Sequence, residues 1–189
     1  SVTLRNGGND RDNTKIRDPF ISRLSEGLEV EVAATRPAIG FINGEYWGVY
    51  TLNEEYTDKY IQYHYGIDDN NVVMIKNGEL DEGEEADYDL FLEMYDFIAW
   101  EDLEDPEVYA QACELIDVGS FADFFAMQFF IINEDGFDKN NNWEMWRVRE
   151  PETDIHPYAD GKWRMMLYDT DYSSGVYTNG GGVDTDNIS

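Results

Sequence analysis

Two stretches of the chain are rich in the acidic and amide side chains that bind hard metal ions. The first, 133–142, holds Asp135 and a run of three asparagines. The second, 167–175, holds Asp169 and Asp171. Each follows a strongly apolar run, so each polar loop is expected to extend from a rigid element. Ligands made only of oxygen suit Mg²⁺, Mn²⁺ or Ca²⁺ rather than zinc or copper.

The order of these groups matches that of a protein-kinase site. Asp135 is followed five residues later by Asn140, then by two strand-like segments and then by Asp169. In kinases the first Asp orients the nucleophile, while the Asn and the second Asp hold Mg²⁺ on the nucleotide phosphates. Residues of these types more often form solvated loops with Asx turns than functional sites. The position of the first loop, directly after an apolar helix and before a strand, is what favours a functional site.

Acidic residues of this kind also occur in calcium-binding EF-hand loops and in glycoside hydrolases. An EF-hand fails on spacing, because with Asp169 at position one Gly175 falls at seven rather than six, and Gly180 stands where the closing Glu belongs. A glycoside hydrolase would pair Asp135 or Glu134 with an aspartate of the second stretch, and the 15% aromatic content suits a sugar cleft. A carboxylate pair is a weak signal among 41 acidic residues.

The charge of the chain narrows the choice of partners. Its 189 residues include 41 Asp and Glu against 13 Lys and Arg, a net charge of −28. Nucleic acid is excluded as an expected partner, since phosphate binding needs a basic face, and an anionic membrane surface is disfavoured for the same reason. The negative electrostatic field of the chain attracts basic proteins and divalent cations. A nucleotide, which is itself negative, would bind only together with metal ions.

Cysteine content and hydropathy indicate neither a disulfide nor a membrane span. Cys113 is the one cysteine and lies in a helical pattern, where it is typical of a small core residue. The longest apolar run, Phe124 to Ile132, is too short to span a bilayer. No signal peptide is visible, and we expect no membrane insertion.

The hydrophobic pattern predicts an α+β fold for one domain over 1–189. An Asn-Gly pair at 43–44 marks a hairpin, and Gly48 predicts a bulge in its second strand. Asp18 and Ser120 are expected to cap helices, and the helix after Ser120 is apolar nearly all round and is predicted to be central. The predicted strands are 2–5, 38–52 (the hairpin), 72–75, 143–148 and 162–168, and the last two are predicted to pair antiparallel. The predicted helices are 19–32, 54–65, 88–100, 106–116 and 121–132. Residues 77–85 are predicted to form a loop.

Four segments, in this order along most of the chain, give it a specific family resemblance. They are Leu4-Arg5-Asn-Gly-Gly-Asn9-Asp10, the hairpin Phe41-Ile-Asn-Gly-Glu-Tyr46-Trp-Gly-Val-Tyr50-Thr-Leu-Asn-Glu54, the loop Asn133-Glu-Asp135 with Asn140-Asn141-Asn142, and Tyr168-Asp169-Thr-Asp171. The chain resembles the CotH kinase family, the spore coat protein H family of atypical bacterial protein kinases. The hairpin carries most of the resemblance.

The resemblance implies a protein-kinase-like, two-lobed fold. Residues 1–56 would be the remainder of the small lobe and the hinge, and 57–189 a partial large lobe. The chain would then be incomplete, starting after the first small-lobe strands and lacking the end of the large lobe. The glycine-rich loop and the phosphate-binding Lys of the family would lie upstream of residue 1. Within this chain, Lys15 and Lys76 are poorly placed to replace that Lys. Weak nucleotide binding by these residues alone is expected.

The resemblance also implies a role for each candidate residue. The catalytic residue would be Asp135, and the metal ligands Asn140 or Asn141, Asp169 and Asp171, with a contribution from Asp138 left open. The hinge that meets adenine would comprise Thr51, Leu52, Asn53 and Glu54.

The implied activity is transfer of the γ-phosphoryl group of ATP, with Mg²⁺ or Mn²⁺, to Ser/Thr of a protein rich in Ser/Thr and basic residues. The implied location is the bacterial spore coat, or a secreted or cell-surface position. A non-catalytic acidic binding or structural module that kept the fold is the main alternative, and a glycoside hydrolase is a weaker one.

Overall fold

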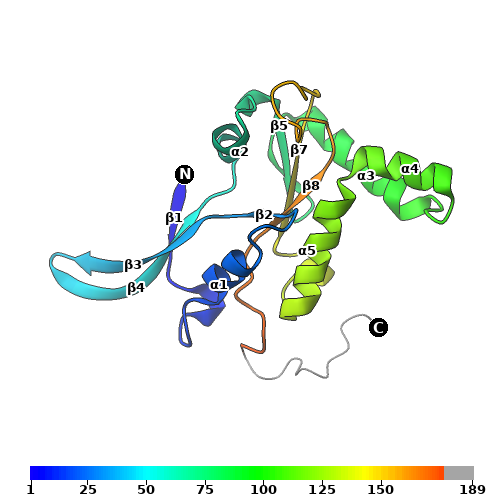
Figure 1. Ribbon diagram of the computed structural model, residues 1–189. Coiled ribbons are helices and arrows are strands. Elements are labelled where there is room, and N and C mark those ends of the chain that lie inside the picture. The colour runs from blue at the N-terminus through cyan, green and yellow to red at the C-terminus, as the bar shows by residue number, and fades with distance from the viewer. Residues whose placement is uncertain (177–189) are drawn as a thin grey trace.

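Two β-sheets of different size, with helices around the larger one, make up the protein (Figure 1). The computed structural model describes residues 1–176, apart from the side chain of Asp138. The smaller sheet has the strand order β1-β4-β3, and the larger has the order β2-β8-β7-β5-β6. This mixture of helices and sheets confirms the predicted α+β class.

The smaller sheet is built on the predicted hairpin. Strand β1 (Val2–Arg5) and strand β3 (Thr35–Ile42) both pair antiparallel with β4 (Glu45–Glu54). The turn residues Asn43 and Gly44 both have positive φ, as a type I′ turn requires. The pairing register shifts beside Gly48, which confirms the predicted bulge.

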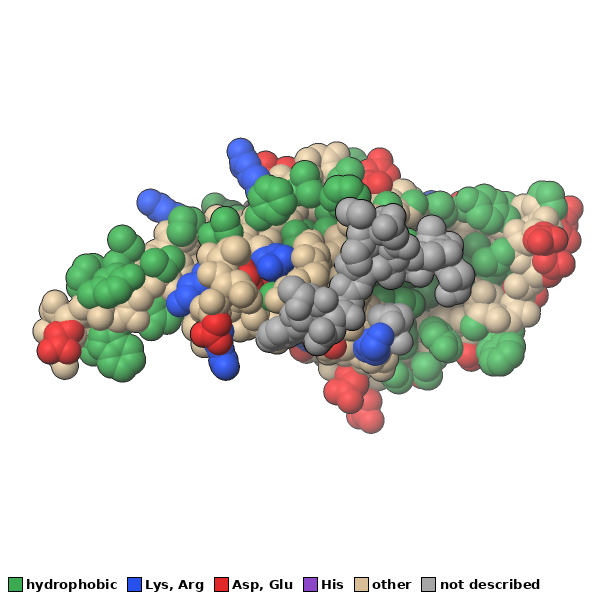
Figure 2. Space-filling model, turned by 90° about the horizontal axis from the view of Figure 1, so that it is seen from below, with side chains coloured by type: hydrophobic (Ala, Val, Ile, Leu, Met, Phe, Trp, Pro, Cys, Tyr) green, Lys and Arg blue, Asp and Glu red, His purple; other side chains and the backbone are tan. Residues whose placement is uncertain are grey.

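The hairpin extends away from the rest of the protein (Figure 1) and carries exposed apolar side chains on it. Figure 2 shows these side chains at one end of the molecule. The most exposed of them are Ile39, Phe41, Tyr46 and Trp47.

Helix α1 (Arg17–Leu24) is shorter than predicted, and Asp18 does not cap it. The helix ends because Ser25 turns its hydroxyl back onto the carbonyl of Ile21 and the chain then turns through Gly27, which has positive φ. The following residues form β2 (Glu31–Val32), which pairs parallel with β8 rather than continuing the helix. The first helical N–H, that of Arg17, is bound by the side chain of Asp10.

The larger sheet includes one strand that was predicted as loop. Its strands are β5 (Val72–Lys76), β6 (Glu79–Glu82), β7 (Trp143–Val148) and β8 (Arg164–Leu167), together with β2. Strands β7 and β8 pair antiparallel, as predicted. Strand β6 lies within the predicted loop 77–85 because Asn77 and Gly78 form a second turn with positive φ at both residues.

The remaining helices are α2 (Asp58–Tyr65), α3 (Tyr88–Trp100), α4 (Pro106–Leu115) and α5 (Val118–Ile131). Helix α2 begins later than predicted because Glu54 still belongs to β4 and Thr57 provides the cap. Helix α5 is capped by Asp117, so the prediction of Ser120 as its cap is wrong; the Ser120 hydroxyl instead accepts the N–H of Met165.

Both faces of the larger sheet are covered, which fixes the direction of every side chain on its central strands. On β5, Val73 and Ile75 join the core beneath α3 and α5, while Val72 and Met74 join the core beneath α2. Helix α5 contributes Phe124, Met127 and Ile131 to the core, as a central helix should, but Phe130 on another face is 71% exposed. Among the described helices, none has the length and apolarity needed to cross a membrane.

Candidate functional site

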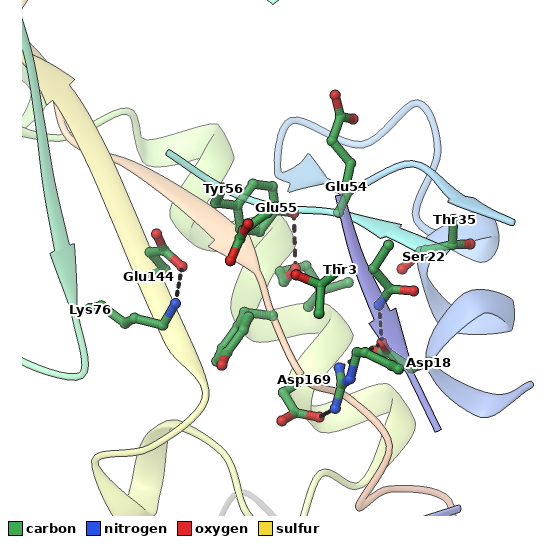
Figure 3. A pocket seen from close by; sticks show the side chains of 15 residues that line it. Thr3, Asp18, Ser22, Thr35, Glu54, Glu55, Tyr56, Lys76, Glu144 and Asp169 are labelled. Carbon is green, nitrogen blue, oxygen red and sulfur yellow. Dashed lines mark hydrogen bonds and ion pairs between the residues drawn. The ribbon is translucent and has the colours of Figure 1, made fainter. Parts of the chain in front are cut away.

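A cleft of about 250 Å³ lies between the two sheets, and seven of its fifteen lining residues are charged (Figure 3). Its walls come from α1, from strands of both sheets (β1, β3 and β4 of the smaller, β5, β7 and β8 of the larger), from the two residues after β8 and from nearby loop residues. The cleft is acidic, because five carboxylates line it against two cations. The acids are Asp18, Glu54, Glu55, Glu144 and Asp169, and the cations are Arg5 and Lys76.

Asp169 lies at the point where β8 ends and the chain turns into the cleft. Its φ is +46°, in the left-handed region that Asp and Asn enter more readily than other non-glycine residues. Such a conformation costs on the order of 1–3 kcal/mol and persists only where surrounding contacts enforce it. Its carboxylate accepts a 2.6 Å bond from Nη2 of Arg5. A strained acid with a cationic partner in a cleft is the kind of arrangement found at functional sites.

Asp18 holds the segment around Asp169 in place. Its Oδ1 accepts the N–H of Thr170 at 3.0 Å and the Thr170 hydroxyl at 2.8 Å. Its Oδ2 accepts Nη1 of Arg5 at 3.1 Å and Nδ2 of Asn53 at 3.2 Å. This single carboxylate therefore joins α1, β1, β4 and the segment after β8.

Asp171 faces the N-terminal loop and is almost fully buried. Its oxygens accept the N–H and the side-chain amide of Asn9, at 3.1 and 3.0 Å, and lie 3.3 Å from Nη2 of Arg5. Burial, with the nearby charge of Asp169, raises the pKa of Asp171 to about 6. A Cβ on Gly8 would come within 1.9 Å of Asp171 Oδ2, so only glycine fits there. Asp171 thus braces a loop.

Asp135 lies in the loop that follows α5 and is oriented by two of the asparagines. Asn141 donates its amide to Asp135 Oδ1 at 3.0 Å, and Asn142 donates to the Asp135 carbonyl at 2.8 Å. The loop begins at Ile132, whose φ of +52° is rare for a β-branched residue. The carboxylate is therefore fixed by its own loop.

The structure brings the two polar stretches together through the backbone. The N–H of Glu134 donates to the Tyr172 carbonyl at 3.0 Å, and the N–H of Ser174 donates to the Ile131 carbonyl at 2.7 Å. The loop of Asp135 and the segment after Asp169 therefore run side by side. This is the arrangement that their order in the sequence predicts.

The candidate asparagines have different surroundings. Asn140 donates its amide to the Asn77 carbonyl at 3.4 Å and accepts the indole N–H of Trp143 at 3.2 Å, so it supports the β5–β6 turn. Asn141 is the one that contacts Asp135. The side chain of Asp138 lies outside the described part of the chain.

The four hinge candidates are also divided by the fold. Asn53 and Glu54 line the cleft. Thr51 is buried and lies opposite Arg5 in the small sheet, and Leu52 lies opposite Leu4. Only the last two of the four thus face the cleft.

The far end of the cleft holds a buried acid that sequence reasoning missed. Glu144 is fully buried on β7, and Nζ of Lys76 lies 3.3 Å from its Oε2, within ion-pair distance but without hydrogen-bond geometry. Burial raises the pKa of Glu144 to about 7, against the opposing effect of Lys76. The same Nζ lies 4.3 Å from the centre of the Tyr168 ring. A lone acid in the apolar strand 143–148 was the available signal.

Arg5 and Asp10 were also missed as site residues. Arg5 contacts three carboxylates, and Asp10, buried beside Arg17, accepts bonds from Thr14, Ile16 and Arg17. Both lie in the N-terminal segment that contributes to the family resemblance. Arg5 meets Asp169 and Asp171 across 164 and 166 positions, so no local pattern predicts these contacts, whereas Asp10 contacts residues four to seven positions away.

No group of three or more Asp, Glu, His or Cys side chains among the described residues is arranged to hold a metal ion by itself. The donors near the two loops are oxygens of Asp135, Asn141 and Asp169, which suit a hard cation. Mg²⁺ is commonly bound by one or two protein carboxylates together with substrate phosphates. The donor chemistry therefore fits a cation that arrives with a phosphorylated ligand.

Comparison with known proteins identifies the family of the chain. A family model described as CotH kinase protein matches residues 1–188, the whole of the chain but its last residue. A search of curated proteins found no significant match. The family resemblance predicted from the four sequence segments is confirmed. The chain belongs to the CotH kinase family and has its kinase-like fold.

Proposed function

We propose that this domain transfers the γ-phosphoryl group of ATP to Ser/Thr hydroxyls of a protein substrate. One observation carries the proposal: the loop that fixes Asp135 is hydrogen-bonded to the segment that places a strained Asp169 in an acidic cleft. Phosphoryl transfer depends mainly on positioning and on electrostatic stabilisation. The rigidly held carboxylates of the two neighbouring loops support the positioning, and a divalent cation bound by them would supply the electrostatic stabilisation.

Each residue has a distinct proposed role. Asp135 accepts a hydrogen bond from the substrate hydroxyl and orients it, and Asn141 keeps the Asp135 carboxylate in place. Asp169 and the amide oxygen of Asn141 would hold Mg²⁺ or Mn²⁺, which supplies positive charge to the phosphates when bound. Asp171 is proposed as a brace rather than a ligand, because Asn9 and Arg5 already occupy its oxygens.

The nucleotide is proposed to lie along the cleft with its phosphates at the Asp169 end. Asn53 and Glu54 line the cleft, so they are better placed to contact the nucleotide than Thr51 or Leu52. An acidic cleft repels a bare triphosphate, so binding is expected to require the metal ion. The same charge favours a basic protein substrate.

The family association with spore coat protein H favours a spore-coat location for the domain, or a secreted or cell-surface one. The net charge of −28 suits an environment with basic, Ser/Thr-rich proteins.

A non-catalytic binding module is the second candidate. One observation favours it: Arg5 lies against Asp169, Asp18 and Asp171, so the site is neutralised in part without any ligand. Such a module would keep the fold and bind basic partners without turnover.

Transfer from radiolabelled ATP to a basic, serine-rich protein in the presence of Mn²⁺ distinguishes the two. Asp169→Ala and Asp135→Ala are expected to lower the rate at least about 100-fold, the size of effect seen when a group that stabilises the transition state is lost. Asp12→Ala is the matched control, because Asp12 is exposed and lies outside the cleft. Unchanged transfer by Asp169→Ala would remove that residue from the mechanism, and no transfer by the wild-type full-length protein that carries this domain would favour the binding module.

A further inference from the structure

We propose that Arg5 is a phosphate-binding cation of the cleft and that Asp18 is the residue that positions it. The proposal deepens the proposed function and rests on it. Arg5 ends β1, lines the cleft and has 23% of its side chain exposed. Figure 3 shows its partners Asp18 and Asp169 together at one end of the cleft.

The guanidinium of Arg5 is shared among three carboxylates. Nη1 lies 3.1 Å from Asp18, while Nη2 lies 2.6 Å from Asp169 and 3.3 Å from Asp171. Burial alone would lower the pKa of Arg5, but the charges of these acids outweigh it and raise the pKa. Arg5 is therefore a permanent cation in the part of the cleft where phosphates are proposed to lie.

The three partners of Arg5 are not equally exchangeable. The Asp18 side chain is 14% exposed and accepts four hydrogen bonds from three residues, and the Asp171 side chain is 3% exposed and is bound by Asn9. The Asp169 side chain is the most open of the three, at 25%. Asp169 is thus the partner that Arg5 can give up, while Asp18 keeps the guanidinium in place.

Replacement of Arg5 by a divalent cation at the Asp169 carboxylate would couple the binding of the cation to the binding of an anion. When a divalent cation takes the Asp169 carboxylate, Nη2 of Arg5 loses its partner there and becomes free to donate to a phosphate oxygen. Arg suits this role because its planar fork binds phosphate oxygens in a directed, charge-assisted way. Lys76, the other cation of the cleft, is held by Glu144 at the far end.

The proposal predicts opposite effects of Arg5 on two ligands. Arg5 competes with a metal ion for Asp169, so Arg5→Gln is expected to bind Mn²⁺ alone more tightly. The same variant loses the phosphate contact, so it is expected to bind inorganic tripolyphosphate with Mn²⁺ at least about tenfold more weakly. A residue with only a structural role would weaken both interactions.

Calorimetric titration of the chain with MnCl₂, and with tripolyphosphate in the presence and absence of Mn²⁺, measures both effects. Arg5→Lys keeps the charge but not the fork, and should retain part of the tripolyphosphate affinity. Asp18→Asn should weaken tripolyphosphate binding in the presence of Mn²⁺, since it loosens the anchor. Arg23→Gln is the matched control, because Arg23 is a highly exposed arginine on α1 whose ion pair is with Glu26.

Tripolyphosphate lacks a base and cannot be turned over as ATP is, so its binding tests Arg5 apart from kinase activity. Arg5-dependent binding without any transfer from ATP by the full-length protein would support the Arg5 site and overturn the proposed function. Transfer from ATP with Arg5→Gln and Arg5→Lys both binding tripolyphosphate like the wild type would overturn the Arg5 proposal alone. Thermal melts identify unfolded variants, and if Arg5→Gln does not fold, equal affinities of Arg5→Lys and wild type overturn the proposal.

Discussion

The two ends of the cleft each hold a basic residue against an acid, but they satisfy their charges in different ways. At one end Arg5 contacts three carboxylates, and one of them, Asp18, also accepts bonds from Asn53 and Thr170. At the other end Lys76 faces Glu144 alone, and the Glu144 oxygens have no hydrogen-bond partner. The first end has excess acceptors, and the second has one acid that is fully buried and poorly solvated.

The difference shows what an ion pair contributes in each setting. A buried carboxylate stabilises a fold when hydrogen bonds satisfy its oxygens, as at Asp18. It costs free energy when burial outweighs the attraction of its partner, as the raised pKa of Glu144 indicates. We therefore expect the Asp18 end to hold the fold and the Glu144 end to weaken it at neutral pH.

Asp18→Ala tests the first half of this comparison and has the largest expected effect. It removes an acceptor shared by Arg5, Asn53 and Thr170, and leaves their donors without that partner. Loss of one partner from a partly buried network of this kind is expected to cost about 2–3 kcal/mol of unfolding free energy. Urea denaturation measures the loss. Asp12→Ala, at an exposed position, is the control, and equal stability of the two variants would contradict the central role of Asp18.

Much of the fold was open to prediction because its signals are local. The dipeptide Asn43-Gly44 between apolar runs predicts the hairpin, and Gly48 predicts its bulge. Asn77-Gly78 is the same signal, but the acidic residues that follow favoured a loop. Those acids belong to β6, an edge strand that is partly exposed. The prediction of a loop gave more weight to the acidic composition of 77–85 than to the Asn-Gly turn signal, and the turn signal was the better guide.

The site was predictable only in part, because half of it depends on contacts remote in sequence. Asp135 and Asp169 follow apolar elements in a recognisable order, so both were proposed. Arg5 meets Asp169 across 164 positions, and Asp18 meets Thr170 across 152. Asp18 was interpreted as a helix cap because local patterns offer no other role for an acid before proline. The lone acid in the apolar strand 143–148 is the local signal for Glu144, but its full burial follows from the cover on both faces of the larger sheet.

Lys76→Met tests the second half of the comparison and is expected to have a smaller effect. Met keeps the apolar stem beside Tyr168 but leaves Glu144 without its cation. Burial then acts on Glu144 without opposition, so its pKa should rise further. At pH 8 this should cost about 1–2 kcal/mol. At pH 5, where Glu144 is already protonated, the cost should be small.

Unfolding curves at pH 5 and pH 8 measure this dependence. Lys59→Met is the control, since the Lys59 side chain is mostly exposed and its partner is Asp69. A Lys76→Met variant that loses equal stability at both pH values would show that Lys76 acts through packing rather than charge.

Glu144→Gln is expected to have the smallest effect, and its sign is opposite. The pKa of Glu144 is about 7 in the folded protein against 4.5 for an ordinary Glu. Between these values the folded state binds more protons than the unfolded state, so the wild-type protein loses stability as pH rises from 4.5 to 7. The groups that act on Glu144 across this range are Lys76 on β5 and the acids Asp81 and Glu82 on β6.

A shift of this size corresponds to roughly 3 kcal/mol at most, and the buried amide and the unpaired Lys76 of the variant offset part of it. We therefore expect Glu144→Gln to match the wild type near pH 5 and to exceed its stability by about 1 kcal/mol at pH 8. Other acids titrate in both proteins, so the difference between their stability curves isolates Glu144. The exposed Glu101→Gln is the control for removing one negative charge. If Glu144→Gln is less stable than the wild type at pH 8, the ion pair with Lys76 stabilises the fold, and the two ends of the cleft are alike.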